Sequence, residues 1–225
     1  MRRNGLYVYA LLGTSIARAR LPRRKMEVMR VGGLFAAAER LRMPPAVTES
    51  ALRRQYRVVV ALSRLSPAVL PVRFGAFMTD EELAEILRAR RTMLLRALKQ
   101  VRGRDQMTVR IFGPPLAVLP ANSPGTGTEY LRARAAASRP ALTPGARALV
   151  KAVSPVVDAQ HVSGPRGGVQ FTIDHLVRRS NVERYRRLLS TCAAELEPRL
   201  DITVSGPRPP FAFAPDIWTP AEGDN

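Results

Sequence analysis

The fold is decided by one apolar stretch, Val69-Leu70-Pro71-Val72-Arg73-Phe74-Gly75-Ala76-Phe77-Met78, which leads directly into Thr79-Asp80-Glu81-Glu82. Its composition predicts a strand that is buried on both faces. Pro71 predicts an edge position or a bulge, because proline cannot donate a hydrogen bond to the sheet. Arg73 is the only charge in the stretch, and a buried guanidinium needs an ion pair or several carbonyl partners. We therefore expect Arg73 to make a structural ion pair.

Helices are expected on either side of this stretch. Thr79 and Glu82 have the spacing of a capping box, which predicts that one helix covers residues 80–100. Upstream, the sequence Thr48-Glu49-Ser50 predicts the start of another helix. The apolar side chains expected on the inner face of that earlier helix are Leu52, Tyr56, Val59 and Val60.

The first 40 residues contain patterns typical of strands. Residues 6–12 are rich in aromatic and β-branched side chains, and residues 26–31 alternate. The run 34–38 suits a strand or a helix. The N-terminus also resembles a signal peptide, but no small-residue cleavage site follows its apolar part, so we interpret it as a first strand.

The second half predicts the order strand, helix, strand, strand, helix, strand. This order is that of a ferredoxin-like domain, an antiparallel sheet with two helices on one face. A capping box at Thr126 and Glu129 starts the first helix, which resumes near Ala146. The expected strands cover residues 106–112, 156–162, 169–177 and 200–204, and the last helix follows a capping box at Ser180 and Glu183.

The fold class predicted from these elements is α+β, with two domains and a tail. Residues 1–104 are expected to form a mixed α/β N-terminal domain. Residues 105–215 are expected to form the C-terminal ferredoxin-like domain, which carries a Pro-rich loop at 113–125. Residues 216–225 are expected to be a mobile tail.

The chain is a basic protein with a formal net charge of +18. Residues 1–110 hold 23 Lys or Arg and 8 Asp or Glu, a net of +15. Such a charge attracts polyanions and acidic proteins. The strong excess of Arg over Lys is equally explained by nucleotide composition, so both interpretations stay open. No apolar run reaches the roughly 20 residues that a membrane helix needs.

No arrangement of residues predicts catalysis, a cofactor or a metal. Cys192 is the only cysteine, which excludes an internal disulfide and a Cys-based metal site. His161 and His175 fall on two strands that flank a hairpin turn, but no third ligand accompanies them. The turn at 164–168 lacks the Gly-Lys-Ser/Thr ending of a phosphate loop. We therefore expect a protein that is not an enzyme.

Four motifs in order resemble those of the gas vesicle protein F and L family. Residues 70–75 resemble its LPxRFGT signature, with Ala76 in place of Thr. Residues 206–213 are similar to its GPWPPYSF terminus, with Arg208, Phe211 and Ala212 replacing Trp, Tyr and Ser. Residues 125–131 are similar to its GxxYL helix start, and residues 175–177 stand where the family has YLV.

This resemblance implies an accessory or minor structural protein of gas vesicle assembly, located in the gas vesicle or the cytoplasm. It would bind the major shell protein or other gas vesicle accessory proteins as a chaperone or nucleator. Partner contact is expected from the first domain and its junction with the second; alternatively, the two signature segments pack on each other. The residues assigned to the signature and to partner contact are Leu70, Pro71, Arg73, Phe74, Gly75, Phe77, Tyr130, Leu131, Gly206, Pro207, Pro209, Pro210 and Phe211.

The competing interpretation is a basic RNA-binding protein that uses a ferredoxin-like sheet. RNA-recognition modules of this shape stack bases on two or three aromatic side chains. Only Phe171 is aromatic on the corresponding strand, and the positive charge lies mainly in the other half. Nucleic acid is therefore not the expected partner.

Overall fold

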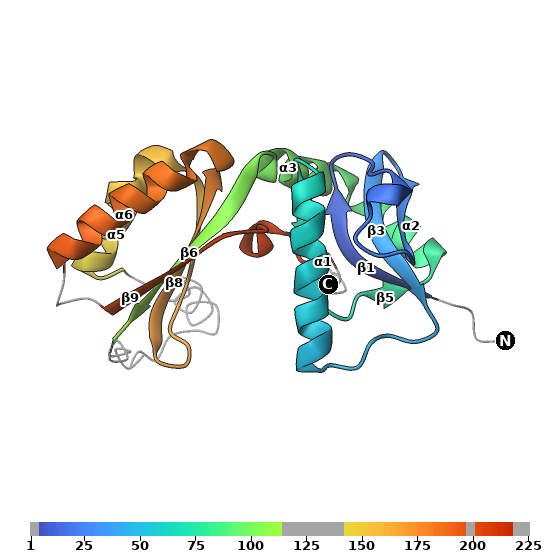
Figure 1. Cartoon of the computed structure of the whole chain (residues 1–225), viewed down its shortest axis with the longest axis horizontal. Helices are drawn as coiled ribbons and strands as arrows, with labels where there is room; N and C mark the ends of the chain where they lie inside the picture. Colours follow the sequence, from blue (N-terminus) through green and yellow to red (C-terminus); the bar gives the residue numbers. More distant parts are fainter. Residues whose placement is uncertain (1–4, 114–141, 197–200, 218–225) are drawn as a thin grey trace, which may run out of the picture. The chain divides into compact units, whose positions relative to one another are not determined.

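The structure is a computed structural model that describes residues 5–113, 142–196 and 201–217. It contains two compact units, each with its own sheet (Figure 1). Unit 1 comprises Met1–Asp105 together with Arg208–Asn225, and unit 2 comprises Gln106–Pro207. The α+β class predicted from the sequence is the class observed.

The C-terminal segment joins the first unit, whereas the sequence assigned residues up to 215 to the second domain. Two side-chain contacts account for the difference: the ring of Phe211 stacks on Tyr56, and Asp216 forms an ion pair with Arg73. Ile217 is 3% exposed, so the second residue of the segment that was expected to be a mobile tail is buried. Residues 218–225 lie outside the described part.

The sheet of unit 1 is organised around β1. Its eight residues are all buried, and it pairs antiparallel with three other strands. The strand order is β2-β3-β1-β4, with β5 also paired to β1. The ambiguous run 34–38 is a strand. The strand bounds are β1 Gly5–Leu12, β2 Met26–Val31, β3 Leu34–Leu41, β4 Val69–Pro71 and β5 Phe77–Met78.

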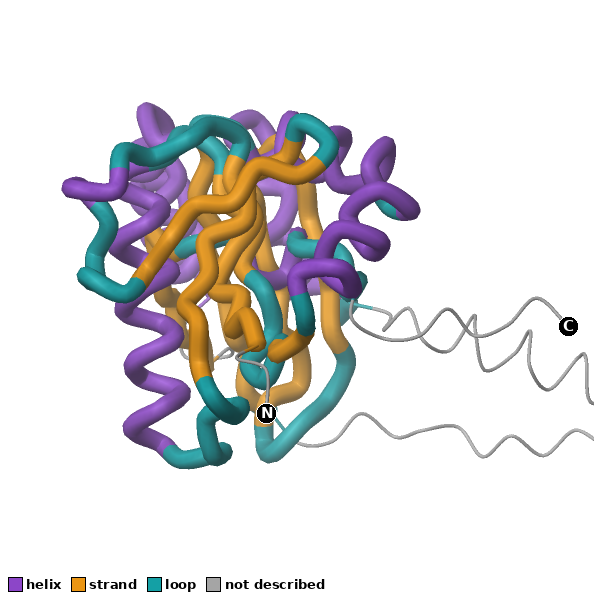
Figure 2. Tube along the Cα trace, turned by 90° about the vertical axis from the view of Figure 1, so that its right-hand side faces the viewer, coloured by secondary structure: helices purple, strands orange, loops and turns teal. Residues whose placement is uncertain are grey.

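Helices lie on both sides of this sheet (Figure 2). Tyr7 and Tyr9 of β1 pack in one core with Val58, Val59 and Leu62 of α1. Burial on both faces explains why β1 is apolar along its whole length rather than alternating. The helices are η1 Arg18–Arg20, α1 Glu49–Leu65, α2 Asp80–Ala89, α3 Arg91–Val101 and, near the C-terminus, η4 Phe211–Phe213.

The apolar stretch 69–78 forms two short strands, so the prediction of one continuous strand was wrong. The backbone N–H of Val72 donates to the Tyr9 carbonyl at 3.0 Å, and the carbonyl of Ala76 accepts from Val8 N–H at 3.0 Å. Between these two bonds the chain leaves the sheet in a turn. Gly75 has φ +94, a conformation that side chains other than glycine rarely adopt.

Two residues of this stretch test the sequence interpretation directly. Pro71 ends β4, which is the edge strand of the order above, as its missing N–H predicted. Arg73 does make an ion pair, with Asp216, but its side chain is 74% exposed. It is exposed because the turn carries it away from the sheet.

Residues 80–100 form two helices rather than the single helix predicted. The capping box is present: Glu82 N–H donates to Thr79 Oγ1 at 3.1 Å, and Thr79 N–H donates to Glu82 Oε2 at 2.7 Å. Arg90 separates α2 from α3 with φ −105 and ψ 15. Arg91 Nε then donates to the Gly32 carbonyl at 2.7 Å, a tertiary contact that local sequence does not reveal.

Unit 2 follows the predicted order of strands and helices, and its sheet order is β7-β8-β6-β9. The helix expected at 126–131 lies outside the described residues, so the ferredoxin-like assignment stays a prediction. Pro144 is the first residue of α5, with Thr143 as N-cap. The elements are β6 Arg104–Phe112, α5 Pro144–Val153, η2 Ser154–Val156, β7 Val157–Ser163, β8 Val169–Arg178, η3 Arg179–Asn181, α6 Val182–Leu196 and β9 Asp201–Arg208.

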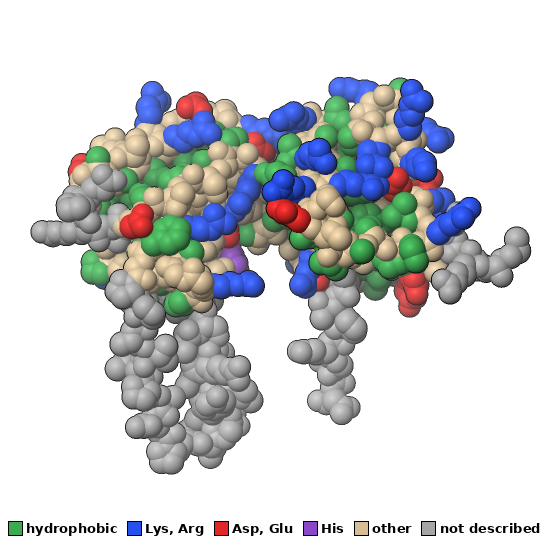
Figure 3. Space-filling view, turned by 60° about the horizontal axis from the view of Figure 1, so that its bottom comes forward, with side chains coloured by type: hydrophobic (Ala, Val, Ile, Leu, Met, Phe, Trp, Pro, Cys, Tyr) green, Lys and Arg blue, Asp and Glu red, His purple; other side chains and the backbone are tan. Residues whose placement is uncertain are grey.

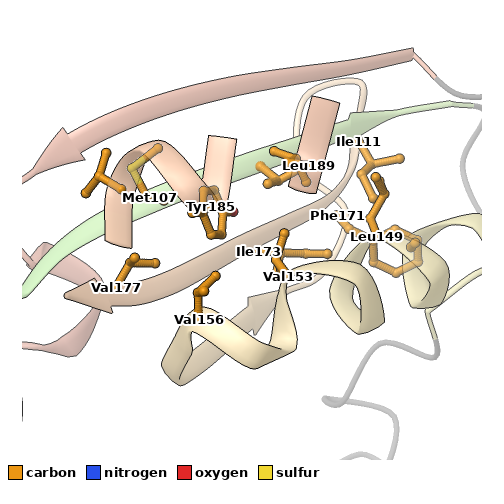
Figure 4. Close-up of a cluster of buried hydrophobic side chains, with 13 residues drawn as sticks. Met107, Ile111, Leu149, Val153, Val156, Phe171, Ile173, Val177, Tyr185 and Leu189 are labelled. Carbon is orange, nitrogen blue, oxygen red and sulfur yellow. The ribbon is translucent and has the colours of Figure 1, made fainter. Parts of the chain in front are cut away.

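The core of unit 2 lies between its sheet and the helices α5 and α6 (Figure 4). Phe171 of β8 is fully buried there, beside Leu149 and Val153 of α5. Cys192 is a free thiol packed against the same core. The predicted capping box at Ser180 is replaced by η3, which precedes α6.

A buried histidine belongs to this unit. His175 is 1% exposed, and its Nδ1 is hydrogen-bonded to the Tyr185 hydroxyl at 2.8 Å. Burial lowers the pKa of His175 to about 4, although the neighbouring Asp174 carboxylate acts in the opposite direction. Asp174 itself accepts hydrogen bonds from Gln106 and Thr108.

This pKa predicts an acid-sensitive fold. Below the ordinary histidine pKa of 6.5 the unfolded chain binds a proton at His175, and the folded chain does not until about pH 4. Stability present above pH 6.5 is therefore lost as the pH falls toward 4, by up to about 3 kcal/mol from this residue. Chemical denaturation across that pH range should show a shallower loss for His175→Gln than for wild type. His161→Gln, at a side chain that is 54% exposed, is the control. Equal slopes for wild type and His175→Gln would contradict the prediction.

Candidate protein-interaction surface

The first signature segment is held in place by a buried amide. Gln55 of α1 is 5% exposed; its Oε1 accepts from the Tyr7 hydroxyl at 2.6 Å, and its Nε2 donates to the Val72 carbonyl at 2.8 Å. The ring of Phe74 lies against Tyr7 with centroids 6.0 Å apart. These contacts fix the turn between β4 and β5 against β1.

The second signature segment packs beside the first. Pro209 and Pro210 are buried, and Asp216, three residues beyond the second segment, forms an ion pair with Arg73 of the first. The β4 strand and η4 are in contact. Mutual packing, the alternative in the sequence analysis, is therefore present in the structure.

Other signature residues also have structural roles. Leu70 is 2% exposed. Within unit 2, the Gly206 carbonyl accepts from Arg186, and a Cβ added at Gly206 would lie 2.7 Å from the Gln106 carbonyl oxygen, so only glycine fits. Pro207 follows it at an exposed position. Tyr130 and Leu131 lie outside the described residues.

The buried face of α1 differs from the prediction. Its buried residues are Gln55, Val58, Val59 and Leu62. Leu52 and Tyr56, which were expected to face inward, are 44% and 45% exposed. The prediction was wrong for Leu52 and Tyr56 because it considered only apolar side chains. Gln55 takes part in the buried face instead, where two hydrogen bonds hold its amide.

An exposed apolar surface results. Leu52 and Tyr56 are one helical turn apart on α1, and the ring of Phe211 stacks on Tyr56 at a centroid distance of 6.0 Å and an interplanar angle of 20°. We call Leu52, Tyr56 and Phe211 the α1 surface. Met43 and Val47, in the loop before α1, are 65% and 80% exposed. Phe211 is thus a signature residue that reaches a surface suited to partner contact.

A hollow of about 700 Å³ lies beside α1 at this surface. Arg53 and Arg57 border it, and Arg53 forms an ion pair with Glu49. The described residues that line it are Glu49, Ser50, Leu52, Arg53, Tyr56 and Arg57. On the face drawn in Figure 3, hydrophobic side chains are mixed with many Lys and Arg and fewer acidic side chains.

One buried carboxylate of unit 1, that of Glu39, is engaged in structural contacts. The Glu39 carboxylate is 1% exposed and lies within hydrogen-bonding or ion-pair distance of Tyr9, Arg23 and Arg54. Burial, together with the Glu39 charge, raises the pKa of Tyr9 to about 12. Within the described ranges, no group of three or more His, Cys, Asp or Glu side chains could hold a metal ion. In the same part of the chain, no helix combines the length and apolar character needed to cross a bilayer.

The position of Phe171 bears on the RNA-binding alternative. Its ring is 0% exposed and packs between β8 and α5 (Figure 4). A base cannot stack on a ring that is enclosed in the core. The one aromatic side chain on which that alternative depended is therefore unavailable to RNA.

Comparison with known proteins identifies the family. A family model described as gas vesicle synthesis protein GvpL/GvpF matches residues 5–215. The chain belongs to this family. No curated protein sequence was found to be similar.

Two crystal structures of GvpF proteins share the fold of this GvpL/GvpF family member. GvpF from Anabaena sp. PCC7120 has a TM-score of 0.72 at 16% identity, over 94% of this chain and 96% of that one. GvpF from Microcystis aeruginosa has a TM-score of 0.72 at 13% identity, over 94% of this chain and 99% of that one. At such identities the likeness establishes the fold.

Removal of the Gln55 amide should destabilise unit 1. Gln55→Leu leaves the Tyr7 hydroxyl and the Val72 carbonyl without their buried partner, at a cost of about 1–3 kcal/mol. Tyr7→Phe should lower the free energy of unfolding less in the Gln55→Leu background than in wild type, because the Tyr7 hydroxyl and the Gln55 amide are coupled. Urea denaturation of the four variants measures both effects. The control is Gln100→Leu, at an exposed position of α3, which should change the free energy of unfolding little. An equally small change for Gln55→Leu would contradict the role assigned to Gln55.

Proposed function

We propose that this protein is an accessory protein of gas vesicle assembly that binds the major shell protein, or other gas vesicle accessory proteins, through the α1 surface. Its place of action is the gas vesicle. It acts by covering apolar surface on its partner, as a chaperone or as a nucleator, and makes or breaks no covalent bond. Membership of the GvpL/GvpF family supports the role in gas vesicle formation.

The observation that carries the proposal is the exposure of Leu52, Tyr56 and Phe211 at one surface. A ring stack between α1 and the C-terminal segment holds Tyr56 and Phe211 in a fixed relation. Aromatic side chains at a rigid surface are typical anchors of protein interfaces, because they bury a large area with little loss of conformational freedom.

The apolar character of shell-forming proteins explains why an exposed aromatic surface on an accessory protein is useful. Proteins that build an apolar shell expose surface that aggregates before assembly. A partner that binds this surface transiently keeps the subunits available for growth of the shell. Both signature segments contribute: the first supports the fold of unit 1, and the second supplies Phe211.

Complementation in vesicle-producing cells tests the proposal. Cells lacking this protein should form few or no vesicles, and the wild-type chain should restore them. Leu52→Gln with Tyr56→Gln removes two anchors, each worth about 1–2 kcal/mol, and should lower the vesicle count at least about tenfold in electron micrographs.

The matched control is Met93→Gln with Leu95→Gln, which changes two apolar side chains of similar exposure on α3. Immunoblots and thermal melting establish that each variant is present and folded. Normal vesicles with the Leu52 and Tyr56 variant, or in the absence of the protein, would overturn the proposed function.

A further inference from the structure

On helix α1, a basic row of side chains runs beside the apolar residues of the α1 surface. Leu52 and Tyr56 form an apolar row with a spacing of one helical turn, and Arg53 and Arg57 form a basic row with the same spacing. Both rows border the same hollow. Leu52 and Tyr56 are about half exposed, so the apolar row is accessible to a partner.

The basic row is only partly neutralised. Arg53 pairs with Glu49, but both side chains are more than 70% exposed, so this contact is weak and easily exchanged. Arg57 forms no ion pair with any residue in the described ranges. The surrounding unit adds to the positive field, since its residues 1–105 and 208–225 hold 23 Lys or Arg and 11 Asp or Glu, a net charge of +12.

We propose that the α1 surface binds an amphipathic helix of another gas vesicle protein, one whose apolar row lies on Leu52 and Tyr56 and whose carboxylates pair with Arg53 and Arg57. This inference rests on the proposed function and specifies the chemistry of the partner segment. A helix presents both kinds of side chain in rows with the one-turn spacing that α1 offers. Its carboxylates recur every three or four residues along one side of its apolar row.

The charge of the surface decides between this partner and a second copy of the chain. A copy would bring a protein of net charge +18 against another of the same charge, and a basic row against a basic row. Juxtaposed like charges suppress an association. The stacked rings of Tyr56 and Phe211 occupy part of each other's faces, which disfavours insertion of a nucleic-acid base.

The identity of the partner segment can be read by photo-crosslinking in vesicle-producing cells. The photoreactive amino acid p-benzoylphenylalanine is incorporated in place of Tyr56, and the linked peptide is identified by mass spectrometry. We expect a peptide from another gas vesicle protein with apolar residues at helical spacing and at least two carboxylates beside them. Incorporation in place of Met93 is the control.

Three crosslinking results would overturn the inference: a peptide without such carboxylates, a peptide of the same chain or of a second copy, or attachment to RNA. A gas vesicle peptide without carboxylates overturns this inference alone and leaves the proposed function standing. Normal vesicles from the Leu52 and Tyr56 variant overturn the proposed function itself.

Charge reversal tests the pairing directly, with a synthetic peptide of the crosslinked segment as the probe. By fluorescence anisotropy, Arg53→Glu with Arg57→Glu should weaken binding at least about tenfold, and the remaining binding should respond less to salt. The control is Arg30→Glu with Arg96→Glu, an equal charge change at exposed positions of β2 and α3, which should weaken binding less than about threefold. Equal weakening by both variants, or no weakening by the first, would show that the two arginines do not pair with the partner.

Discussion

The burial of Gln55 is the constraint on which the rest of unit 1 depends. Its amide connects the hydroxyl of Tyr7 on the central strand to the carbonyl of Val72 in the signature turn. Leaving this buried amide without partners would destabilise the fold by more than the two hydrogen bonds stabilise it. The two bonds therefore fix the rotation of α1 about its own axis. That rotation leaves Leu52 and Tyr56 in solvent. The exposed apolar surface therefore lies on the same helix, beside the face that the polar contact of Gln55 holds inside.

The two signature segments differ in role: the first is mainly structural, and the second contains a partly exposed aromatic residue. In the first, the close contact of Phe74 with Tyr7 and the left-handed backbone of Gly75 shape the turn, while Leu70 and Pro71 fill the sheet edge. In the second, Pro209 and Pro210 are buried and Phe211 is partly exposed. A motif shared by a family can thus be mostly structural and still contribute an exposed aromatic residue.

Local patterns were sufficient to predict most of the fold. The alternation of residues 26–31, the hairpin at 164–168 and the capping box at Thr79 depend on near neighbours, and each is present. The predictions that were wrong concern elements whose geometry depends on contacts between residues far apart in the sequence. The rotation of α1 depends on Gln55 reaching Val72, and the break at Arg90 is accompanied by a bond from Arg91 to Gly32.

The candidate surface was harder to predict than the fold, for the same reason. Sequence identified Phe211 as a signature residue, but placed Tyr56 inside the protein. No local pattern indicates that these two rings meet, because they are 155 residues apart in the sequence. Likewise, the ion pair expected at Arg73 could be predicted, but its partner Asp216 could not.

The central claim is that this protein works by adhesion through the α1 surface of unit 1. Amide hydrogen exchange, measured on the free chain and on the chain bound to isolated gas vesicles, tests it most directly. The account predicts slower exchange on binding in residues 43–57 and 208–217, with residues 142–196 unchanged. Protection confined to residues 142–196 would contradict it.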